Sequence, residues 1–331
     1  MAPRLSLLVV VHRIPRQARN TLRSLSPGYQ RGVTPGDYEI VVAENASDAT
    51  LGEAAAREAA GGASVTYIAR NEPGVSPVPA LNDAFAASRG ETVALAIDGA
   101  RMFTPRLVEQ ILVARRLYDA PLVVAPGYHL GPKPQYLSAR EGYDEATEQA
   151  LLERARWEEN GYALFDHACF DDTNDSGLLN PYLESTCLAC PRTCFEAIGG
   201  ADPGFVSPGG GIVNLDLLAR LSALPGTRLV TLAGEGAFHQ FHGGTSSAGH
   251  ADREARLAGF RAEYERLRGR PYATVDREPL LLGPMPKEAH RFLERSAELG
   301  RMRAAMVREK GLPLWDDGGL RPGAGQSWRT Q

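Results

Sequence analysis

The sequence feature that most constrains the fold is the apolar run at residues 93–97, which ends abruptly at Asp98 and Gly99. A short continuous apolar run predicts a strand buried on both faces, as in a parallel sheet. Asp98 then lies at the carboxyl end of that strand, the edge of an open α/β sheet where ligands bind. The structural alternative is that Asp98 caps the next helix, or that Gly99 simply turns the chain.

The composition indicates an ordinary globular protein and excludes some classes of partner. The 331 residues fit one large α/β domain, or one domain with an appendage. With 36 basic and 40 acidic residues the net charge is −4. The chain therefore lacks the excess of basic residues that is typical of proteins that bind nucleic acid or anionic membranes. The scarcity of lysine, with abundant Ala, Gly and Pro, indicates a GC-rich bacterial genome. Because no apolar run has transmembrane length and no signal-peptide cleavage pattern follows residues 5–11, we expect a cytoplasmic protein without a membrane segment.

Strand and helix patterns alternate through the first third of the chain. Apolar runs predict strands, and helical spacing fills the stretches between them. Right-handed crossovers then make a mostly parallel, Rossmann-like sheet with helices on both faces. The expected strands are 5–11, 38–43, 64–69, 93–97 and 122–125.

The second half is less regular. We predict helices, a polar loop and two more strands there, followed by a helical C-terminal part. The predicted helices are 144–160, 193–198, 212–224, 252–267 and 287–310, the loop is 165–181, and the strands are 182–189 and 228–232. The expected domains are 1–248, made of a nucleotide-binding half 1–126 and an acceptor half 127–248, then a helical extension 249–312 and a disordered tail 313–331.

Several segments, in this order and spacing, carry a family likeness. The segments are the strand 5–11, the loop 41–48, Gly74-Val75-Ser76 with Ala80-Leu81-Asn82, Ile97-Asp98-Gly99-Ala100, the stretch 195–202, and Asp216 to Leu221. From about residue 5 to 244 the chain resembles family-2-like inverting glycosyltransferases of the GT-A fold. The resemblance implies a GT-A-like α/β fold and transfer of a sugar from a nucleotide-diphospho-sugar.

The resemblance also implies roles for single residues. Glu44 matches the acidic position that recognises the nucleotide base, and Asn45 and Asp48 would line the same pocket. Asp98 matches the first aspartate of the Asp-x-Asp motif, which holds a divalent cation against the diphosphate, and Arg101 would contact the diphosphate. The full set implied for the donor nucleotide is Val11, His12, Glu44, Asn45, Asp48, Asn82, Ile97, Asp98, Gly99 and Arg101.

The chain departs from the family pattern at two positions. The second aspartate of the metal motif is Ala100, so one carboxylate is missing. The family's Glu-Asp pair falls on Val213-Asn214, and an asparagine cannot accept a proton at neutral pH. Both the metal requirement and the catalytic base therefore need other residues.

The resemblance implies a late histidine that contacts the metal or the phosphates, and it favours His239 or His242 for this role. We therefore predict a metal site at Asp98, His239 and His242. The two histidines follow a strand and are surrounded by glycines, which allow a diphosphate to approach the backbone. Carboxylate and imidazole ligands suit Mn²⁺ or Mg²⁺, with imidazole favouring the former. The structural alternative is that the histidine pair only closes a loop.

The base that deprotonates the acceptor hydroxyl must be a carboxylate or histidine within hydrogen-bond reach. The candidates are Asp216, Glu184, Asp202 and the pair Asp171 and Asp172, of which we rank Asp216 first and Glu184 second. The alternatives are that Asp216 caps a helix and that Glu184 is an exposed charge on a strand. The acidic run at 171–175 is interpreted as a solvated loop.

The four cysteines allow a zinc hypothesis, which we set aside. Cys187, Cys190 and Cys194 have suggestive spacing, with Cys169 or His167 nearby in sequence. Their spacing crosses a strand, a proline and a helix start, with no tight turn between the first pair. Buried free thiols are the favoured interpretation.

The resemblance therefore implies an inverting glycosyltransferase, of the hexosyltransferase class. Its donor is a UDP- or GDP-linked sugar, and its acceptor is a saccharide or small molecule. Two alternatives stay open: a catalytically inactive carbohydrate- or nucleotide-binding module, and a nucleotidyltransferase on a related fold. The apolar spacing of the C-terminal helices fits either a cover over the acceptor site or a homodimer contact.

Overall fold

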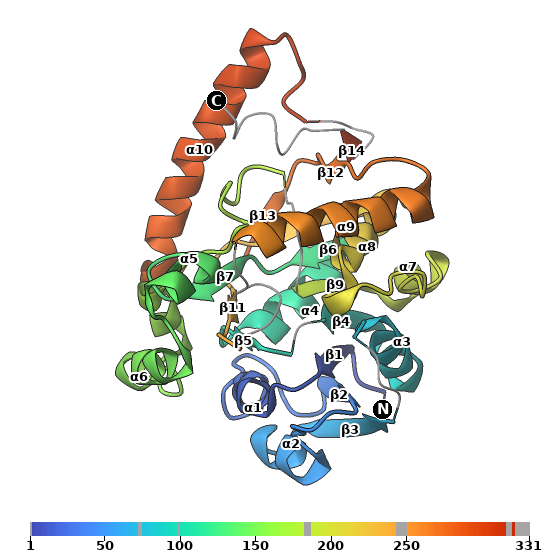
Figure 1. Cartoon of the computed structure of the whole chain (residues 1–331), viewed down its shortest axis with the longest axis vertical. Helices are drawn as coiled ribbons and strands as arrows, with labels where there is room; N and C mark the ends of the chain where they lie inside the picture. The colour runs from blue at the N-terminus through green and yellow to red at the C-terminus, as the bar shows by residue number, and fades with distance from the viewer. Residues whose placement is uncertain are drawn as a thin grey trace.

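The computed structural model describes residues 2–71, 75–97, 99–181, 187–242, 250–315 and 320–321. Figure 1 shows the N-terminal strands and helices at one end of the molecule, and α10 running along one side at the other end. Within the described residues, an eight-stranded sheet has the order β13-β10-β6-β9-β4-β1-β2-β3. The bounds of its strands are β1 Leu5–Val11, β2 Tyr38–Asn45, β3 Ser64–Arg70, β4 Thr92–Ala96, β6 Pro121–Val124, β9 Cys187–Pro191, β10 Arg228–Leu232 and β13 Leu280–Leu282.

The sheet is mostly parallel, as the sequence predicts. β1 runs parallel to both β2 and β4, with Val9 level with Val42 on one side and with Ala96 on the other. β9 is the exception, since it runs antiparallel to both of its neighbours, β4 and β6. The carboxyl ends of β1, β2 and β4 therefore share one edge, where the sequence places the ligand site.

Helices cover both faces of the sheet because side chains of a strand alternate between them. Leu7 and Val9 of β1 pack into one hydrophobic cluster, and Leu8 and Val10 pack into a second cluster on the opposite face. One cluster includes residues of α1 (Pro15–Ser24), α2 (Glu53–Ala59) and α4 (Leu107–Leu117). The other includes residues of α3 (Val78–Ala87), α7 (Arg192–Ala197), α8 (Val213–Ser222) and α9 (His250–Arg268).

A second sheet, which the sequence analysis did not predict, lies beside the first. Its order is β5-β11-β7-β8 within the described chain. The bounds are β5 Arg101–Phe103, β7 Gly127–Leu130, β8 Ala168–Phe170 and β11 Ala237–His239. The expected polar loop 165–181 is thus wrong in its first part: the 3₁₀ helix Gly161–His167 and β8 occupy residues 161–170. A third hydrophobic cluster around Tyr128, Phe165 and Phe238 fills this part of the molecule.

The remaining predicted elements are present with shifted ends. α6 spans Glu145–Ala155, and Asp144 caps it by accepting a hydrogen bond from the Thr147 amide at 2.8 Å. The strand expected at 182–189 is β9, of which the structure describes residues 187–191. The other elements are α5 Gln135–Ser138, α10 His290–Glu309, β12 Thr274–Val275, β14 Leu320–Arg321 and the 3₁₀ helices Ala139–Glu141, Pro208–Gly210 and Lys287–Ala289.

The segment 250–312, the described part of the expected helical extension, packs against the main body. β13 continues the main sheet beside β10, with Leu280 level with Val230. Tyr264 of α9 and Phe292 of α10 belong to two different hydrophobic clusters of the body. A domain boundary at residue 248, which lies outside the described residues, stays a prediction. Within the described residues, no helix is both long and apolar enough to cross a membrane.

Candidate active site

A cleft of about 750 Å³ opens at the carboxyl ends of the first strands. Val10 of β1, Asn45 of β2 and Ile97, which follows β4, line one side of it. The segment from Pro208 to Leu215 and the α9 side chains Arg256, Leu257 and Phe260 line the other. This volume lies within the range of small-molecule sites, about 300–1,000 Å³.

Gly99 lies where two backbone segments meet on the floor of the cleft. Its amide donates to the carbonyl of Val10 at 3.0 Å. A Cβ atom at this position would lie 2.4 Å from the same carbonyl oxygen, so only glycine allows the approach. Close packing therefore requires a glycine at position 99, and Gly99 also lines the cleft.

Arg101 enters the cleft from the first residue of β5 and is held by a buried ion pair. Its Nη1 lies 3.3 Å from Oδ2 of Asp171, and both side chains are nearly inaccessible. Burial alone would raise the pKa of Asp171, but the charge of Arg101 and the hydrogen bonds from Asn174 and Thr173 outweigh burial and hold the pKa below its usual range. The pair thus stays ionised and fixes the Arg101 guanidinium beside the cleft.

Asp171 is itself fixed by its own loop. Its Oδ1 accepts hydrogen bonds from the amides of Thr173 and Asn174 and from both of their side chains, at 2.8–3.2 Å. The interpretation of the acidic run 171–175 as a solvated loop is wrong for Asp171, which is 3% exposed. Asp171, Asp172 and Thr173 all line the cleft.

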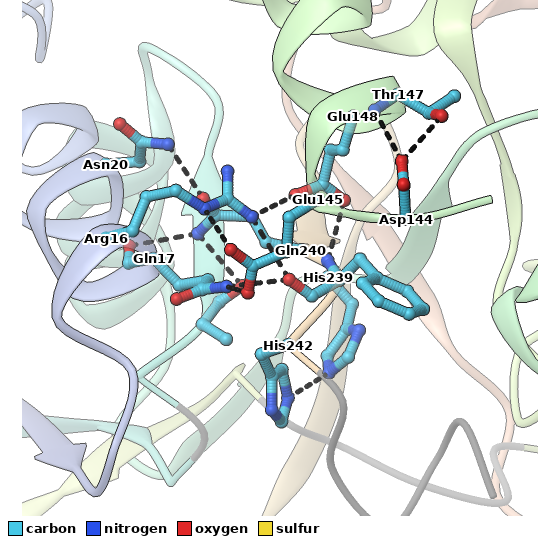
Figure 2. A network of polar contacts seen from close by, with 12 residues as sticks. Arg16, Gln17, Asn20, Asp144, Glu145, Thr147, Glu148, His239, Gln240 and His242 are labelled. Atoms are coloured by element: carbon cyan, nitrogen blue, oxygen red, sulfur yellow. Dashed lines mark hydrogen bonds and ion pairs between the residues drawn. The ribbon is translucent and has the colours of Figure 1, made fainter. Parts of the chain in front are cut away.

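His239 and His242 are brought together, as the sequence predicts. His239 ends β11, which pairs antiparallel with β5 so that His239 lies opposite Arg101. The Nε2 atoms of the two histidines lie 3.1 Å apart. Figure 2 shows the two rings side by side below the polar network described next, and His242 lines the cleft.

Residues 240 and 241, between the two histidines, are clamped by two helices. Figure 2 shows Arg16 and Gln17 of α1 and Glu148 of α6 converging on this segment. The carbonyl of Phe241 accepts from Gln17 Nε2 at 2.7 Å and from Arg16 Nη2 at 3.1 Å. Its amide donates to Glu148 Oε2 at 2.6 Å. His242 therefore follows a backbone whose position is set from both sides.

Glu148 makes this clamp from a buried position. Burial raises the pKa of its carboxyl to about 7, although hydrogen bonds from Phe241 and Arg16 lower it. The same Arg16 guanidinium donates to Glu148 Oε1 at 3.0 Å. Burial of a carboxylate is costly unless it is paired, and these two donors are its compensation.

Glu44, predicted to recognise the nucleotide base, is committed to its own loop. It is 2% exposed, and its carboxylate accepts from the amides of Leu51 and Gly52 at 2.6 and 3.0 Å and from the hydroxyl of Tyr67. This geometry favours ordering of the loop after β2, with base recognition left to neighbouring groups. Direct contact between Glu44 and a base stays a prediction.

The other predicted donor residues fall into two groups. His12, Asn45, Ile97, Gly99 and Arg101 line the cleft. Asp48 lies on the surface in an ion pair with Arg13, another cleft residue, at 2.8 Å. Val11 is in the hydrophobic core, and Asn82 makes a reciprocal pair of hydrogen bonds with the backbone of Ala201 at 2.9 and 3.1 Å.

Asp216, ranked first as the base, lies away from the cleft lining. It is 0% exposed, and both of its oxygens face guanidinium groups. Arg220 Nε lies 2.7 Å from Oδ2, while Arg268 approaches with Nε at 2.6 Å from Oδ1 and Nη2 at 2.7 Å from Oδ2. The carboxylate thereby joins α8 to α9, and this placement favours a structural role.

Two predicted site residues, Asp98 and Glu184, lie outside the described residues. Among those that are described, no group of three or more histidine, cysteine, aspartate or glutamate side chains is placed to hold a metal ion. Of the three predicted metal ligands, the structure describes only His239 and His242.

The cysteines are free thiols, as the sequence favours. Cys187 and Cys190 lie on opposite faces of β9, each in a different hydrophobic cluster. They point away from one another and do not form a zinc site. Burial raises the pKa of Cys187 to about 12 and that of Cys190 further.

The sequence analysis did not predict His129 as a cleft residue, and it ranked Asp172 below Asp216 and Glu184. His129 lies in β7, a strand of four residues whose pattern gave no signal. The adjacent acidic residues at 171 and 172 were noticed, but only the pairing of Asp171 with Arg101 separates a buried anchor from a solvated loop. Asn214, which replaces the family's aspartate, also lines the cleft.

No family model matches the chain, and no curated protein matches it. Solved structures similar to it include the mannosyltransferase of Pyrobaculum calidifontis in complex with GDP-Man and Mn²⁺, at 16% identity and a TM-score of 0.47, covering 94% of this chain and 76% of that one. Another is glucosyl-3-phosphoglycerate synthase of Mycobacterium tuberculosis with Mn²⁺, UDP and phosphoglyceric acid, at 18% identity and a TM-score of 0.48, covering 83% and 81%.

A third similar structure is TarS of S. aureus, at 12% identity and a TM-score of 0.46, covering 80% of this chain. This chain spans 40% of the length of that TarS structure. The chain is thus similar in structure to these proteins. At these identities and TM-scores the likeness carries no argument about activity, which the cleft must supply.

Proposed function

We propose that the chain is a glycosyltransferase that moves a sugar from a nucleotide-diphospho-sugar to an acceptor hydroxyl, with inversion at the anomeric carbon. The observation that carries the proposal is the joint placement of Arg101 and His242 in one cleft at the carboxyl ends of β1, β2 and β4. The positive charge of Arg101, the two histidines and the exposed backbone at Gly99 suit the binding of a diphosphate. Ligands bind at this edge of open α/β sheets.

The donor is proposed to lie with its nucleotide toward the ends of β1 and β2. His12 and Asn45 line that part of the cleft. Asn45 Oδ1 accepts from Arg70 Nε at 3.0 Å, which orients the amide. The diphosphate would then lie over Gly99, within reach of Arg101, whose charge offsets that of the phosphates. The donor base, UDP- or GDP-type, and hexosyl transfer stay predictions.

A divalent cation, Mn²⁺ or Mg²⁺, is proposed at His239 and His242 with Asp98. The 3.1 Å between the two Nε2 atoms fits this, because neighbouring ligands each about 2.1 Å from an octahedral ion lie about 3.0 Å apart. Such a cation would offset the charge that develops on the leaving diphosphate. The pair of imidazoles would suit Mn²⁺ better than Mg²⁺.

Two carboxylates compete for the role of base. Asp172 lines the cleft, and its neighbour Asp171 is occupied by Arg101 and its own loop. Glu184 is the candidate that the sequence supplies. In-line attack requires the acceptor hydroxyl to lie within hydrogen-bond reach of whichever acts. The acceptor would enter beside Phe260 of α9, which lines the opposite wall. A saccharide or small-molecule acceptor stays a prediction, as does a homodimer.

A binding module without catalysis is the second candidate. Asn214 lines the cleft at the position where the resemblance implies a catalytic aspartate, and it cannot act as a base. Such a module would bind a nucleotide-sugar and leave it intact. The two functions share the donor site and differ only in turnover.

The test is release of nucleoside diphosphate from UDP- and GDP-sugars, with Mn²⁺, in the presence of a panel of saccharide acceptors. We expect acceptor-dependent release that His242→Ala lowers at least 100-fold. His290→Ala, at an exposed histidine of α10, is the matched control and should match wild type. Binding without release by any donor–acceptor pair would favour the binding module.

Amide variants identify the base. Asp172→Asn and Glu184→Gln each remove one candidate, and loss of a base costs about 10²–10⁴-fold in kcat. We expect one variant to lose kcat to this extent while its KM for the donor stays within threefold. Equal, small effects of both variants would contradict a carboxylate base at either position.

A further inference from the structure

Gln135 lies between two histidines of neighbouring strands. His129 of β7 and His239 of β11 are partners in the parallel register of these strands, with ring centroids 5.4 Å apart. Gln135, the first residue of α5, is 1% exposed and hydrogen-bonds to both. A buried amide in this position can decide which ring nitrogen of each histidine carries the proton.

The bonds to His239 have only one consistent assignment. Gln135 Nε2 lies 2.9 Å from the carbonyl oxygen of His239, and that oxygen can only accept, so the NH₂ group must face it. The other amide atom, Oε1, then lies 2.7 Å from His239 Nδ1 and can only accept. His239 must therefore carry its proton on Nδ1, which leaves a lone pair on Nε2. That lone pair is directed toward His242 Nε2 at 3.1 Å.

The bond to His129 gives the opposite result. The backbone amide of Gln135 lies 3.1 Å from His129 Nδ1. A backbone N–H can only donate, so Nδ1 of His129 must be the acceptor. Neutral His129 therefore carries its proton on Nε2. One residue thus imposes different tautomers on two histidines that are adjacent across the strands.

We propose that Gln135 is a positioning residue that makes His239 a cation ligand beside His242, and makes His129 a hydrogen-bond donor in the cleft that His242 lines. The inference rests on the proposed function for the identity of the cation and deepens it. It assigns the two imidazole ligands to His239 and His242. Nε2 of neutral His129 is excluded as a metal ligand because it carries the proton. Residues that orient a ligating histidine through its other ring nitrogen typically change metal affinity 10- to 100-fold when replaced.

The tautomers can be observed directly in the metal-free wild-type chain. Long-range ¹H–¹⁵N correlation spectra at about pH 8.5, where imidazoles are neutral, distinguish protonated from unprotonated ring nitrogens. His129→Asn and His239→Asn assign the signals. We expect His239 protonated on Nδ1 and His129 on Nε2. The same tautomer at both positions would overturn the proposal, whatever the activity of the protein.

Variants of Gln135 then test the dependence. Gln135→Leu removes both side-chain bonds to His239, and Gln135→Glu restores an acceptor for its Nδ1–H. We expect Gln135→Leu to weaken Mn²⁺ binding 10- to 100-fold by calorimetry and to mix the His239 tautomers. Gln135→Glu keeps that acceptor but loses the donor to the His239 carbonyl, so it should keep the Nδ1-protonated tautomer and bind Mn²⁺ more tightly than Gln135→Leu.

Gln30→Leu is the matched control for loss of a buried amide. Gln30 is 3% exposed and donates to the carbonyls of Ser24 and Thr104 at 2.7 and 3.0 Å, away from the cleft. It should lower the thermal midpoint about as much as Gln135→Leu without changing Mn²⁺ affinity. Equal loss of affinity in both variants would overturn the positioning role. If wild type binds no Mn²⁺ but shows the two tautomers, and Gln135→Leu mixes those of His239 alone, the proposed metal site fails and the tautomer assignment stands.

Discussion

The role of Asp216 depends on the two arginines that contact it, Arg220 and Arg268, more than on the chemistry of a carboxylate. The sequence shows an acidic residue in an apolar helix, a pattern that fits a catalytic base as well as a structural ion pair. Arg220 is four residues away and could be anticipated from helical spacing. Arg268 is 52 residues away and joins Asp216 only through the packing of α9 on α8. No local pattern announces such a contact.

Asp216→Asn should destabilise the protein while sparing the chemistry. It leaves two guanidiniums facing a neutral amide in a buried place, which costs about 3 kcal/mol. Urea denaturation measures this loss. Glu159→Gln, which breaks the exposed pair with Arg156, is the control and should change the unfolding free energy by less than about 0.5 kcal/mol. A folded Asp216→Asn protein with kcat reduced more than 100-fold would restore Asp216 as the base.

Glu235 predicts a pH dependence of stability. Burial raises the pKa of its carboxyl from 4.5 to about 7, only partly offset by hydrogen bonds from Thr104, Tyr162 and Arg106. The folded state therefore holds this proton more tightly than the unfolded state. Its stabilising contribution is complete below pH 4.5 and is lost as pH rises through about 7, on the order of 3 kcal/mol in all.

Glu235→Gln removes this titration. The unfolding free energy of wild type relative to the variant should fall by roughly 3 kcal/mol between about pH 4.5 and 8, by urea denaturation at each pH. Glu109→Gln, at a partly exposed neighbour of Arg106, is the control and should show no such trend. A constant difference between wild type and Glu235→Gln across this range would contradict a raised pKa.

At the scale of elements, long periodic segments could be predicted and short ones could not. The buried strands of five to eight residues, such as β1 and β4, follow directly from their apolar runs. β5 and β8 have three residues each, too few for a period, and they exist because the second sheet pairs them. The flanking glycines drew attention to His239 and His242, whose rings the structure places side by side, while their role at a metal stays a prediction. The tautomers imposed by Gln135 could not, because they depend on strand register.

β9 supplies a test at this scale. Cys187 and Cys190 lie on its two faces at the centre of the sheet, both inaccessible. Their raised pKa values keep them as unreactive thiols. N-ethylmaleimide labelling mapped by mass spectrometry should modify them only in step with global unfolding in urea, while the partly buried Cys194 reacts earlier. Rapid native labelling of Cys187 would contradict the position of β9 inside the sheet.

At the scale of the whole molecule, the C-terminal third is held by the body at several places. Arg303 of α10 forms an ion pair with Asp276 at 2.6 Å, and both side chains are buried. Phe292 packs on Tyr128 of the second sheet, with ring centroids 4.7 Å apart. The sequence predicted these helices but not their docking, since their apolar residues fit several partners. Figure 1 shows α9 lying across the body close to α8.

A fragment of residues 1–248 should therefore fail to fold cooperatively. It lacks β13, which pairs with β10, and it leaves the apolar surfaces beneath Tyr264 and Phe292 open to water. The near-UV circular dichroism of the fragment and the slope of its urea transition report this directly. A fragment with a sharp transition and the spectrum of a packed core would support an independent domain ending at residue 248.

The central claim is that the cleft binds a nucleotide diphosphate through a divalent cation, Arg101 and the histidine pair. The most direct measurement is the thermal midpoint with UDP, GDP, dTDP and CDP, each with Mn²⁺, with Mg²⁺ and with chelator. A ligand that binds only the native state raises the midpoint with the logarithm of its saturation. We predict a rise with UDP or GDP that requires Mn²⁺ or Mg²⁺ and is lost in Asp98→Ala and His242→Ala but kept in His290→Ala. No rise with any nucleotide under any condition would contradict the donor site.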